Sequence, residues 1–228
     1  MFGLDEKIAS LGSGEAFVLV ALVAVLLGLR HAGDPDHLTA VTTLIAGDGG
    51  HDHRRARSLG LVWGLGHATT LFAFGLPIVI AKNYLPEPIQ QGAEAAVGIL
   101  IIGLAVRLLL RCRAGAFRDG PGHRHAHGRT PLQAYGIGLV HGMGGSAGVG
   151  VLLLAAIPDR AEAIVALALF AAFTAVSMAL ASSTFGYALT RPPVLRRFAA
   201  VAPALGMLSL AFGVWYSLGA LNAVPYVF

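Results

Sequence analysis

The chain is poor in cysteine and in charged residues. Cys112 is the only cysteine among 228 residues, which excludes an intramolecular disulfide, a thiolate metal cage and a CxxC redox pair. Charged residues make up only 12% of the chain and hydrophobic residues 56%, and the mean hydropathy is +0.71. These values exclude an ordinary soluble globular domain and place the chain among membrane proteins.

A continuous basic surface is also lacking. The formal net charge is +4, but apolar segments separate the arginines into short clusters, so we predict no nucleic-acid partner. The first 15 residues, MFGLDEKIASLGSGE, contain no basic n-region and no credible cleavage site. We therefore do not expect a removable signal peptide.

Long apolar windows, in contrast, are abundant. About 20 apolar residues suffice for a helix to cross a bilayer. Six windows of this kind occur, at about 16–46, 58–81, 92–111, 132–157, 163–188 and 199–221. With so many apolar windows, the chain has too few other residues to shield these helices from water. The sequence predicts an all-α polytopic membrane protein with six transmembrane helices, in a single domain of residues 1–228.

The distribution of basic residues predicts the orientation of these spans. The first, third and fifth connections hold Arg54, Arg55, Arg57, Arg111, Arg113, Arg118, Arg124, Arg129, Arg191, Arg196 and Arg197. The opposite side holds only Lys7, Lys82 and Arg160. The positive-inside rule therefore places the arginine-rich connections in the cytoplasm and both termini outside the cytoplasmic (inner) membrane.

The two halves of the chain resemble each other. GLRHAGDPDHLTAVTTLIA, from Gly28, aligns without gaps with GLVHGMGGSAGVGVLLLAA, from Gly138, and this pairs His31 with His141. AVGILIIGLAV and ALGMLSLAFGV match further along at almost the same offset. Three spans per half would invert the second half, which is typical of secondary transporters. We predict two inverted three-helix repeats, at about 16–111 and 132–221, joined by a basic, histidine-rich cytoplasmic loop at 112–131.

Ionisable residues interrupt the first apolar window. LGLRHAGDPDHLTAVTTLIAG, residues 27–47, places one arginine, two aspartates and two histidines within eight positions. An aspartate or arginine at the centre of a membrane helix costs about 2.5–3.5 kcal/mol, which makes such a cluster functional by default. Pro35 lacks an N–H and disfavours helical geometry at Asp34. The first helix is therefore predicted to break at Gly33–Pro35, with Asp34 as a candidate N-cap.

This cluster has the donors of a divalent metal site. His31 and His37 supply imidazoles, Asp34 and Asp36 supply carboxylates, and such donors without sulfur favour nickel, cobalt or zinc. Since the ligating forms are neutral imidazole and ionised carboxylate, binding should weaken on acidification. In the alternative interpretation Asp34 is only a helix cap, Asp36 pairs with Arg30, and both histidines are packing residues.

The stretch RHAGDPDH fits the R-H-A-x-D-x-D-H signature of the nickel/cobalt permeases, and the chain resembles that family. The resemblance implies that His31, Asp36 and His37 recognise the metal. GLGHATTLF is similar to the family's second conserved stretch, which implicates His67. The short length and VHGMGGSAG resemble the small urease-accessory nickel permeases.

One departure from the family concerns the second half. Larger members carry an acidic L-G-x-D-T-A-T-E stretch, whereas this chain has no acid between Asp119 and Asp159. That leaves His141, with Ser146, to serve the second half. The alternative for His67 and for His141 is a packing histidine.

The resemblance implies a permease without enzymatic activity or a prosthetic cofactor. Its transported substrate would be Ni²⁺ or Co²⁺, moved inward by the membrane potential. The expected partners are the cation, membrane lipid and a nickel-enzyme maturation pathway such as that of urease. The predicted metal ligands are His31, Asp34, Asp36, His37, His67 and His141.

A second class of function stays open at this point. GGSAG, residues 144–148, fits the G-x-S-x-G pattern, and Ser146 with a buried histidine would indicate an intramembrane serine protease. That nucleophile needs a strand-to-helix turn, whereas small residues within a span usually let helices approach one another. The histidine-rich stretches 51–53 and 123–129 either pass metal onward or are ordinary solvated loops.

Overall fold

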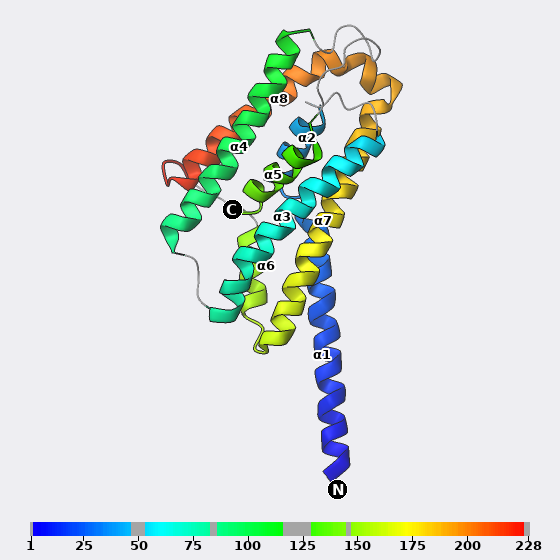
Figure 1. Cartoon of the computed structure of the whole chain (residues 1–228), viewed down its shortest axis with the longest axis vertical. Helices are drawn as coiled ribbons and strands as arrows, with labels where there is room; N and C mark the ends of the chain where they lie inside the picture. Colours follow the sequence, from blue (N-terminus) through cyan, green and yellow to red (C-terminus); the bar gives the residue numbers. More distant parts are fainter. Residues whose placement is uncertain (1, 47–52, 83–85, 116–128, 145–146, 226–228) are drawn as a thin grey trace.

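The computed structural model describes residues 2–46, 53–82, 86–115, 129–144 and 147–225, and these residues form helices and connections without any strand. The helices are α1 (Phe2–His31), α2 (Pro35–Ala46), α3 (His53–Ala81), α4 (Glu87–Arg113), α5 (Pro131–His141), α6 (Ala147–Ala155), α7 (Arg160–Thr190) and α8 (Pro192–Ala220) (Figure 1). The predicted all-α class is therefore confirmed for the described part of the chain.

Among the described residues, four helices are long and apolar enough to cross a membrane: Arg54–Ala81, Glu87–Arg113, Arg160–Thr190 and Arg197–Ala220. The pair Phe17–His31 and Pro35–Ala46, bent by 49°, would make a fifth span if both parts belong to one crossing. The window expected at 132–157 does not form one continuous helix. It contains α5 and α6, with 11 and 9 residues, and each is too short to cross a core about 30 Å thick. The count of six spans stays a prediction.

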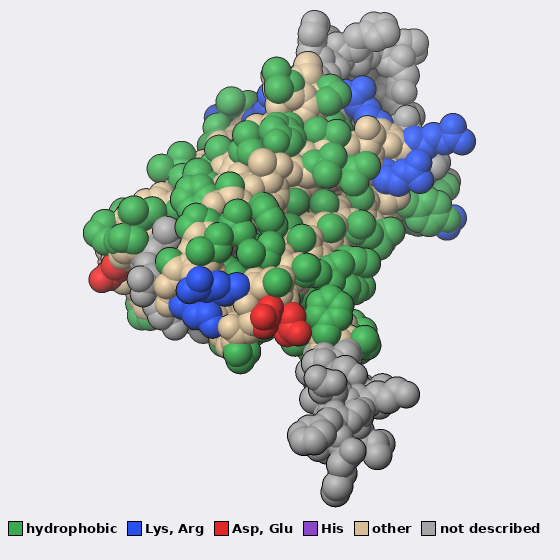
Figure 2. All heavy atoms as spheres, turned by 60° about the horizontal axis from the view of Figure 1, so that its bottom comes forward, with side chains coloured by type: hydrophobic (Ala, Val, Ile, Leu, Met, Phe, Trp, Pro, Cys, Tyr) green, Lys and Arg blue, Asp and Glu red, His purple; other side chains and the backbone are tan. Residues whose placement is uncertain are grey.

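The outer surface is apolar. Ile99, Leu132, Leu180 and Leu208 are among many large hydrophobic side chains that are exposed. Figure 2 shows hydrophobic side chains over most of the visible face, with the charged side chains in a few separate groups. Hydrocarbon suits such a surface far better than water does, so this is the surface of a membrane protein.

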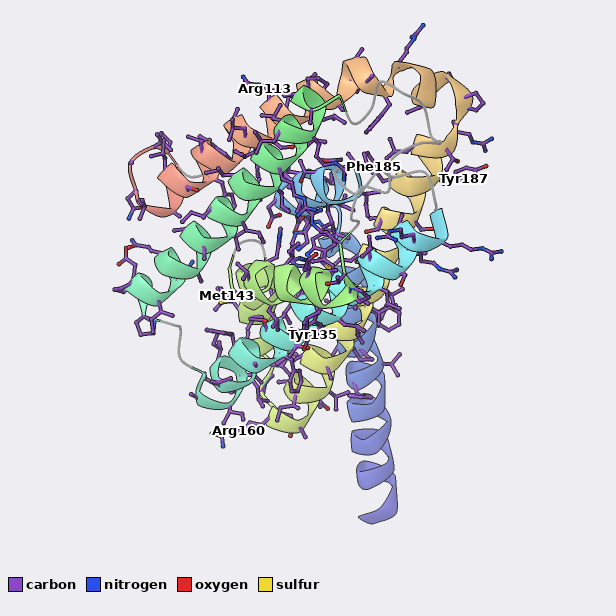
Figure 3. All side chains as sticks on the ribbon, turned by 45° about the horizontal axis from the view of Figure 1, so that its top comes forward. Arg113, Tyr135, Met143, Arg160, Phe185 and Tyr187 are labelled. Carbon is purple, nitrogen blue, oxygen red and sulfur yellow. The ribbon has the colours of Figure 1, made fainter. Side chains whose placement is uncertain are left out.

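Basic residues lie at both ends of the helix bundle, and the arginine-rich connections share one end. A guanidinium nitrogen of Arg55 donates to the carbonyl oxygen of Arg129 (3.3 Å), which joins the start of α3 to the start of α5. At the other end, Nζ of Lys82 donates to two carbonyl oxygens of the α6–α7 connection (3.2 and 3.1 Å). Arg113 and Arg160 accordingly lie far apart, at opposite ends of the bundle (Figure 3).

Two aligned glycines allow close helix crossings. A Cβ atom at Gly28 of α1 would lie 2.6 Å from the carbonyl oxygen of Phe170 on α7. A Cβ atom at Gly138 of α5 would overlap the carbonyl oxygen of Trp63 on α3 and lie 2.8 Å from the backbone nitrogen of His67. Small residues allow membrane helices to pack backbone against backbone. As a result, α1 packs on α7 and α5 packs on α3.

Candidate metal centre

Two helices end in the middle of the bundle, each at a histidine. α1 ends at His31, and α5 ends at His141. Three non-helical residues follow His31, and Pro35 then begins α2. The backbone carbonyl of Asp34 accepts a hydrogen bond from the N–H of Leu38 (3.0 Å), as the first bond of that helix. Because Pro35 has no N–H to give to the preceding turn, the chain turns here and directs the start of α2 into the same region.

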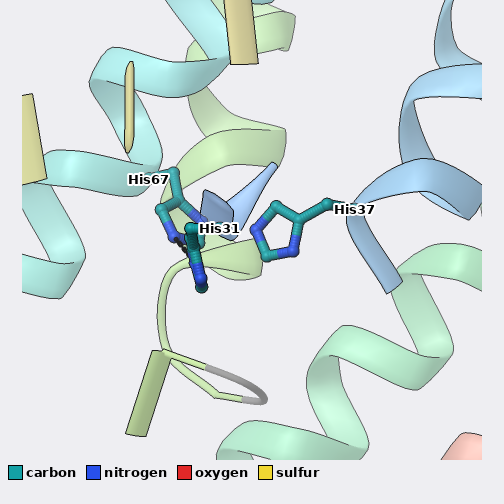
Figure 4. Close-up of side chains that lie close together, drawn as sticks. All are labelled: His31, His37 and His67. Atoms are coloured by element: carbon teal, nitrogen blue, oxygen red, sulfur yellow. Dashed lines mark hydrogen bonds between the residues drawn. The ribbon is translucent and has the colours of Figure 1, made fainter. Parts of the chain in front are cut away.

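Three buried histidines meet beside this turn. His31, His37 and His67, from α1, α2 and α3, have at most 3% of their surface exposed. Nε2 of His31 lies 3.0 Å from Nε2 of His67, and the His37 ring centroid is 4.4 and 4.9 Å from those of His31 and His67. The three side chains point toward one another (Figure 4). One nitrogen from each lies within 4.8 Å of the others.

A second group of donors shares His37 with the first. Nδ1 of His37 lies 3.0 Å from Oδ1 of Asp36, and Oδ2 of Asp36 lies 3.4 Å from Nε2 of His141. The rings of His37 and His141 are 4.4 Å apart. Asp36, His37 and His141 also offer three ligand atoms within 4.8 Å of one another. Both groups together form one buried cluster, which we call the histidine cluster, and it includes residues from both halves of the chain.

Several polar atoms of this cluster have no hydrogen-bond partner in the described part of the chain. They are Oδ2 of Asp36, Nε2 of His37, Nδ1 of His67 and both ring nitrogens of His141, although Oδ2 of Asp36 and Nε2 of His141 face each other at 3.4 Å. Buried polar atoms are nearly always hydrogen-bonded, and an unsatisfied one costs about 1–3 kcal/mol. Buried imidazole nitrogens and carboxylate oxygens gathered in this way could hold a metal ion.

Asp34 has a different position. Its Oδ1 lies 3.3 Å from Nη2 of Arg30, and its Oδ2 lies 3.3 Å from Nδ1 of His31. It therefore touches the ring nitrogen of His31 that faces away from His67, and it belongs to neither group of three. The alternative pairing of Arg30 with Asp36 is wrong, because Arg30 pairs with Asp34.

An aromatic side chain that the sequence analysis did not select covers one side of the cluster. The Trp63 ring lies 6.0 Å from that of His37 and 5.5 Å from that of His141, and it is fully buried. Trp63 and His67 are four residues apart on α3, which puts them on one helix face. This four-residue spacing from His67 is the sequence pattern that could have identified Trp63 as a neighbour of the cluster.

Three further features fall wholly or largely outside the described residues. Ser146 lies outside the described residues. Positions 51–52 and 123–128, which make up most of the two histidine-rich stretches, lie outside them as well. Nothing in the described residues supports the protease alternative.

Comparison with known proteins gives two relatives. The urease accessory protein UreH of Bacillus sp. (strain TB-90) is 26% identical over 213 residues, which cover 86% of this chain and 90% of that protein. The nickel transporter NicT of Mycobacterium tuberculosis (strain ATCC 25618 / H37Rv) is 38% identical over 88 residues, which cover 37% of this chain and 23% of that protein. These similarities confirm the resemblance to the nickel/cobalt permeases. No family model and no solved structure matches the chain.

Proposed function

We propose that this protein is a permease that carries Ni²⁺ into the cytoplasm across the inner membrane, and that His31, Asp36, His37, His67 and His141 bind the ion on its way. The names of the two relatives support a nickel-transport role. The observation that carries the site assignment is the histidine cluster, with its buried and unpartnered ligand atoms. The urease accessory relative supports a link to the maturation of a nickel enzyme, as we also propose.

One pair of donors already has a spacing that suits a first-row transition metal. Two nitrogens bound to one ion at about 2.1 Å and at right angles are about 3.0 Å apart. Nε2 of His31 and Nε2 of His67 share a hydrogen bond of 3.0 Å, so they already have the separation of two such ligands, and an ion between them would replace that bond. Square-planar nitrogen and oxygen ligands are typical of Ni²⁺ and Cu²⁺, and the set contains no sulfur.

Within this proposal Asp34 positions a ligand and does not bind the ion. A carboxylate on one ring nitrogen of a histidine fixes its tautomer and its orientation, so that the other nitrogen can bind metal. Asp34 stands in that relation to His31. Since Arg30 also pairs with Asp34, the negative charge of Asp34 is offset, whereas that of Asp36 faces the histidines.

The packing supports the inverted repeat that the proposal requires. In the repeat, α1 corresponds to α5 and α3 corresponds to α7. The contact of α1 with α7 therefore corresponds to the contact of α5 with α3, and both contacts are extensive. The aligned glycines Gly28 and Gly138 occupy the corresponding crossings. The histidines that end α1 and α5 are aligned as well, which places one imidazole from each half in the cluster, as in transporters with a shared central site.

Trp63 offers a direct test of binding. The chain contains two tryptophans, Trp63 and Trp215, so Trp215→Phe leaves only the one beside the cluster. Ni²⁺ added to this purified variant should quench its fluorescence with saturation. His141→Ala should weaken the apparent affinity less than Asp36→Asn does, because it removes a neutral donor and leaves the charge. Absence of quenching, or a larger loss with His141→Ala, would contradict the assignment.

The orientation can be tested with single cysteines. In a Cys112→Ala background, Ser58→Cys lies at the arginine-rich end and Ala161→Cys at the opposite end, and both positions are exposed. In intact cells we expect an impermeant thiol reagent to label Ala161→Cys only, because the arginine-rich end should face the cytoplasm. Labelling of Ser58→Cys alone would show the reverse orientation.

A further inference from the structure

A groove lies between α4 and α5. Its volume is about 580 Å³, and it is lined by Ile99, Leu100, Gly103, Leu104, Arg107, Arg129, Gln133, Gly136, Ile137 and Val140. No acidic residue is among these lining residues. The groove is thus bounded by aliphatic side chains, two glycines, one amide and two guanidinium groups.

The polar and apolar parts of the groove lie at different depths. Arg107 is the lining residue of α4 nearest its C-terminal end, and Arg129 and Gln133 are those nearest the N-terminal end of α5. Both ends belong to the arginine-rich end of the bundle. From Arg107 to Ile99 the groove then follows α4 for about 12 Å toward the membrane interior, at 1.5 Å per residue. It is therefore cationic near the membrane surface and apolar below.

The guanidinium group of Arg107 is a positive charge without an acidic partner among the described residues. Its side chain is exposed, and no acidic residue pairs with it in the described part of the chain. It lies six residues before Arg113, the end of α4, or about 9 Å along the axis. Arg129 is buried and donates to the carbonyl oxygen of Leu44 at the end of α2 (2.9 Å), and its positive charge adds to that of Arg107.

The two glycines keep the apolar part open. A Cβ atom at Gly103 or at Gly136 would meet no other atom within 4 Å, unlike the glycines at the helix crossings. These positions face the groove without filling it, which leaves room for a hydrocarbon chain.

We propose that this groove binds one anionic phospholipid, with its phosphate at Arg107 and Gln133 and an acyl chain along Gly103, Gly136 and Ile137. A transported cation would be repelled by the two arginines, so the groove is a poor exit path for the metal. Basic pockets between membrane helices on the cytoplasmic side suit anionic head groups. This proposal does not depend on the nickel-transport proposal.

Native mass spectrometry of the delipidated protein tests it. We expect dioleoylphosphatidylglycerol to bind more tightly than dioleoylphosphatidylcholine, and Arg107→Gln to weaken the phosphatidylglycerol affinity about fivefold. Arg113→Gln, on the same helix but outside the groove, should change it little. Equal losses in both variants, or no preference between the two lipids, would overturn the proposal. So would competition by inorganic phosphate at lipid concentrations, because that would indicate a free-anion site.

Filling the groove provides the matched steric test. Gly103→Leu should lower occupancy by phosphatidylglycerol, whereas Gly92→Leu should not, since Gly92 on the same helix is also unobstructed but does not line the groove. If Gly103→Leu does not yield folded protein, Gly136→Leu blocks the groove from α5 instead. Unchanged lipid occupancy in a folded variant of either kind would overturn the proposal.

Discussion

Replacing Asp36 with asparagine should abolish uptake of radiolabelled nickel in cells that lack other nickel transporters. Asp36 lies within reach of His37 and His141 (3.0 and 3.4 Å), so its charge is central to the histidine cluster. Arg30 offsets the other buried carboxylate, Asp34. Without Asp36, a divalent ion would enter a low-dielectric site with no uncompensated negative charge. Losing one partner of a buried charge pair costs about 2–5 kcal/mol, or about thirtyfold or more in affinity.

The matched control is Asp34→Asn, which changes the neighbouring carboxylate in the same isosteric way. It should weaken Ni²⁺ binding by about tenfold, less than the thirtyfold or more expected for Asp36→Asn, and leave measurable uptake at high nickel concentrations, because losing an outer carboxylate misorients a ligand without removing it. Both variants need to be expressed at the wild-type level in the membrane. Normal uptake by Asp36→Asn, or equal defects in both variants, would contradict the roles assigned to the two aspartates.

The sequence predicted the members of this cluster better than their contacts. Histidines and aspartates are costly inside a bilayer, so the composition of RHAGDPDH alone indicates a candidate site. Pro35 predicts the break in the helix beside which these residues meet. Which aspartate pairs with Arg30 depends on how residues 30–36 turn in space. The pairing of Arg30 with Asp34 has the i,i+4 spacing of neighbours on a helix, but Asp34 lies after the end of α1, so the spacing alone did not decide between the two aspartates.

The fold shows the same division between local and long-range information. Hydropathy located the long apolar helices α3, α4, α7 and α8, because each is long and apolar enough by itself to cross a membrane. The window at 132–157 is equally apolar, so hydropathy could not show that two helices share it. The contact of Trp63 with His141 and the groove between α4 and α5 arise from packing between residues far apart in the chain. Local sequence patterns contain little information about such contacts.

Replacing Gly138 with alanine should destabilise the protein and weaken nickel binding together. Alanine normally favours a helix over glycine by about 1 kcal/mol, so the exchange would stabilise α5 if space allowed. At Gly138 the added methyl group would overlap the Trp63 carbonyl oxygen and crowd the His67 backbone nitrogen. Unlike a side chain, the backbone of α3 cannot move away from the methyl group by changing rotamer. Overpacking of this kind therefore costs about 1–3 kcal/mol or more. The steric term therefore outweighs the gain in helix propensity.

Gly136→Ala, two residues earlier on the same helix, is the matched control, because a Cβ atom there meets nothing within 4 Å. It should keep or raise the melting temperature and leave Trp63 quenching by Ni²⁺ unchanged. Gly138→Ala should lower the melting temperature, and it should also reduce Ni²⁺ affinity in the protein that remains folded. The reason is geometric: separating α5 from α3 moves His141 away from His67 and Trp63, which the crossing now brings together. Should Gly138→Ala lose stability but keep full affinity, the crossing would matter for folding only, and the position of His141 would have to be fixed by other contacts.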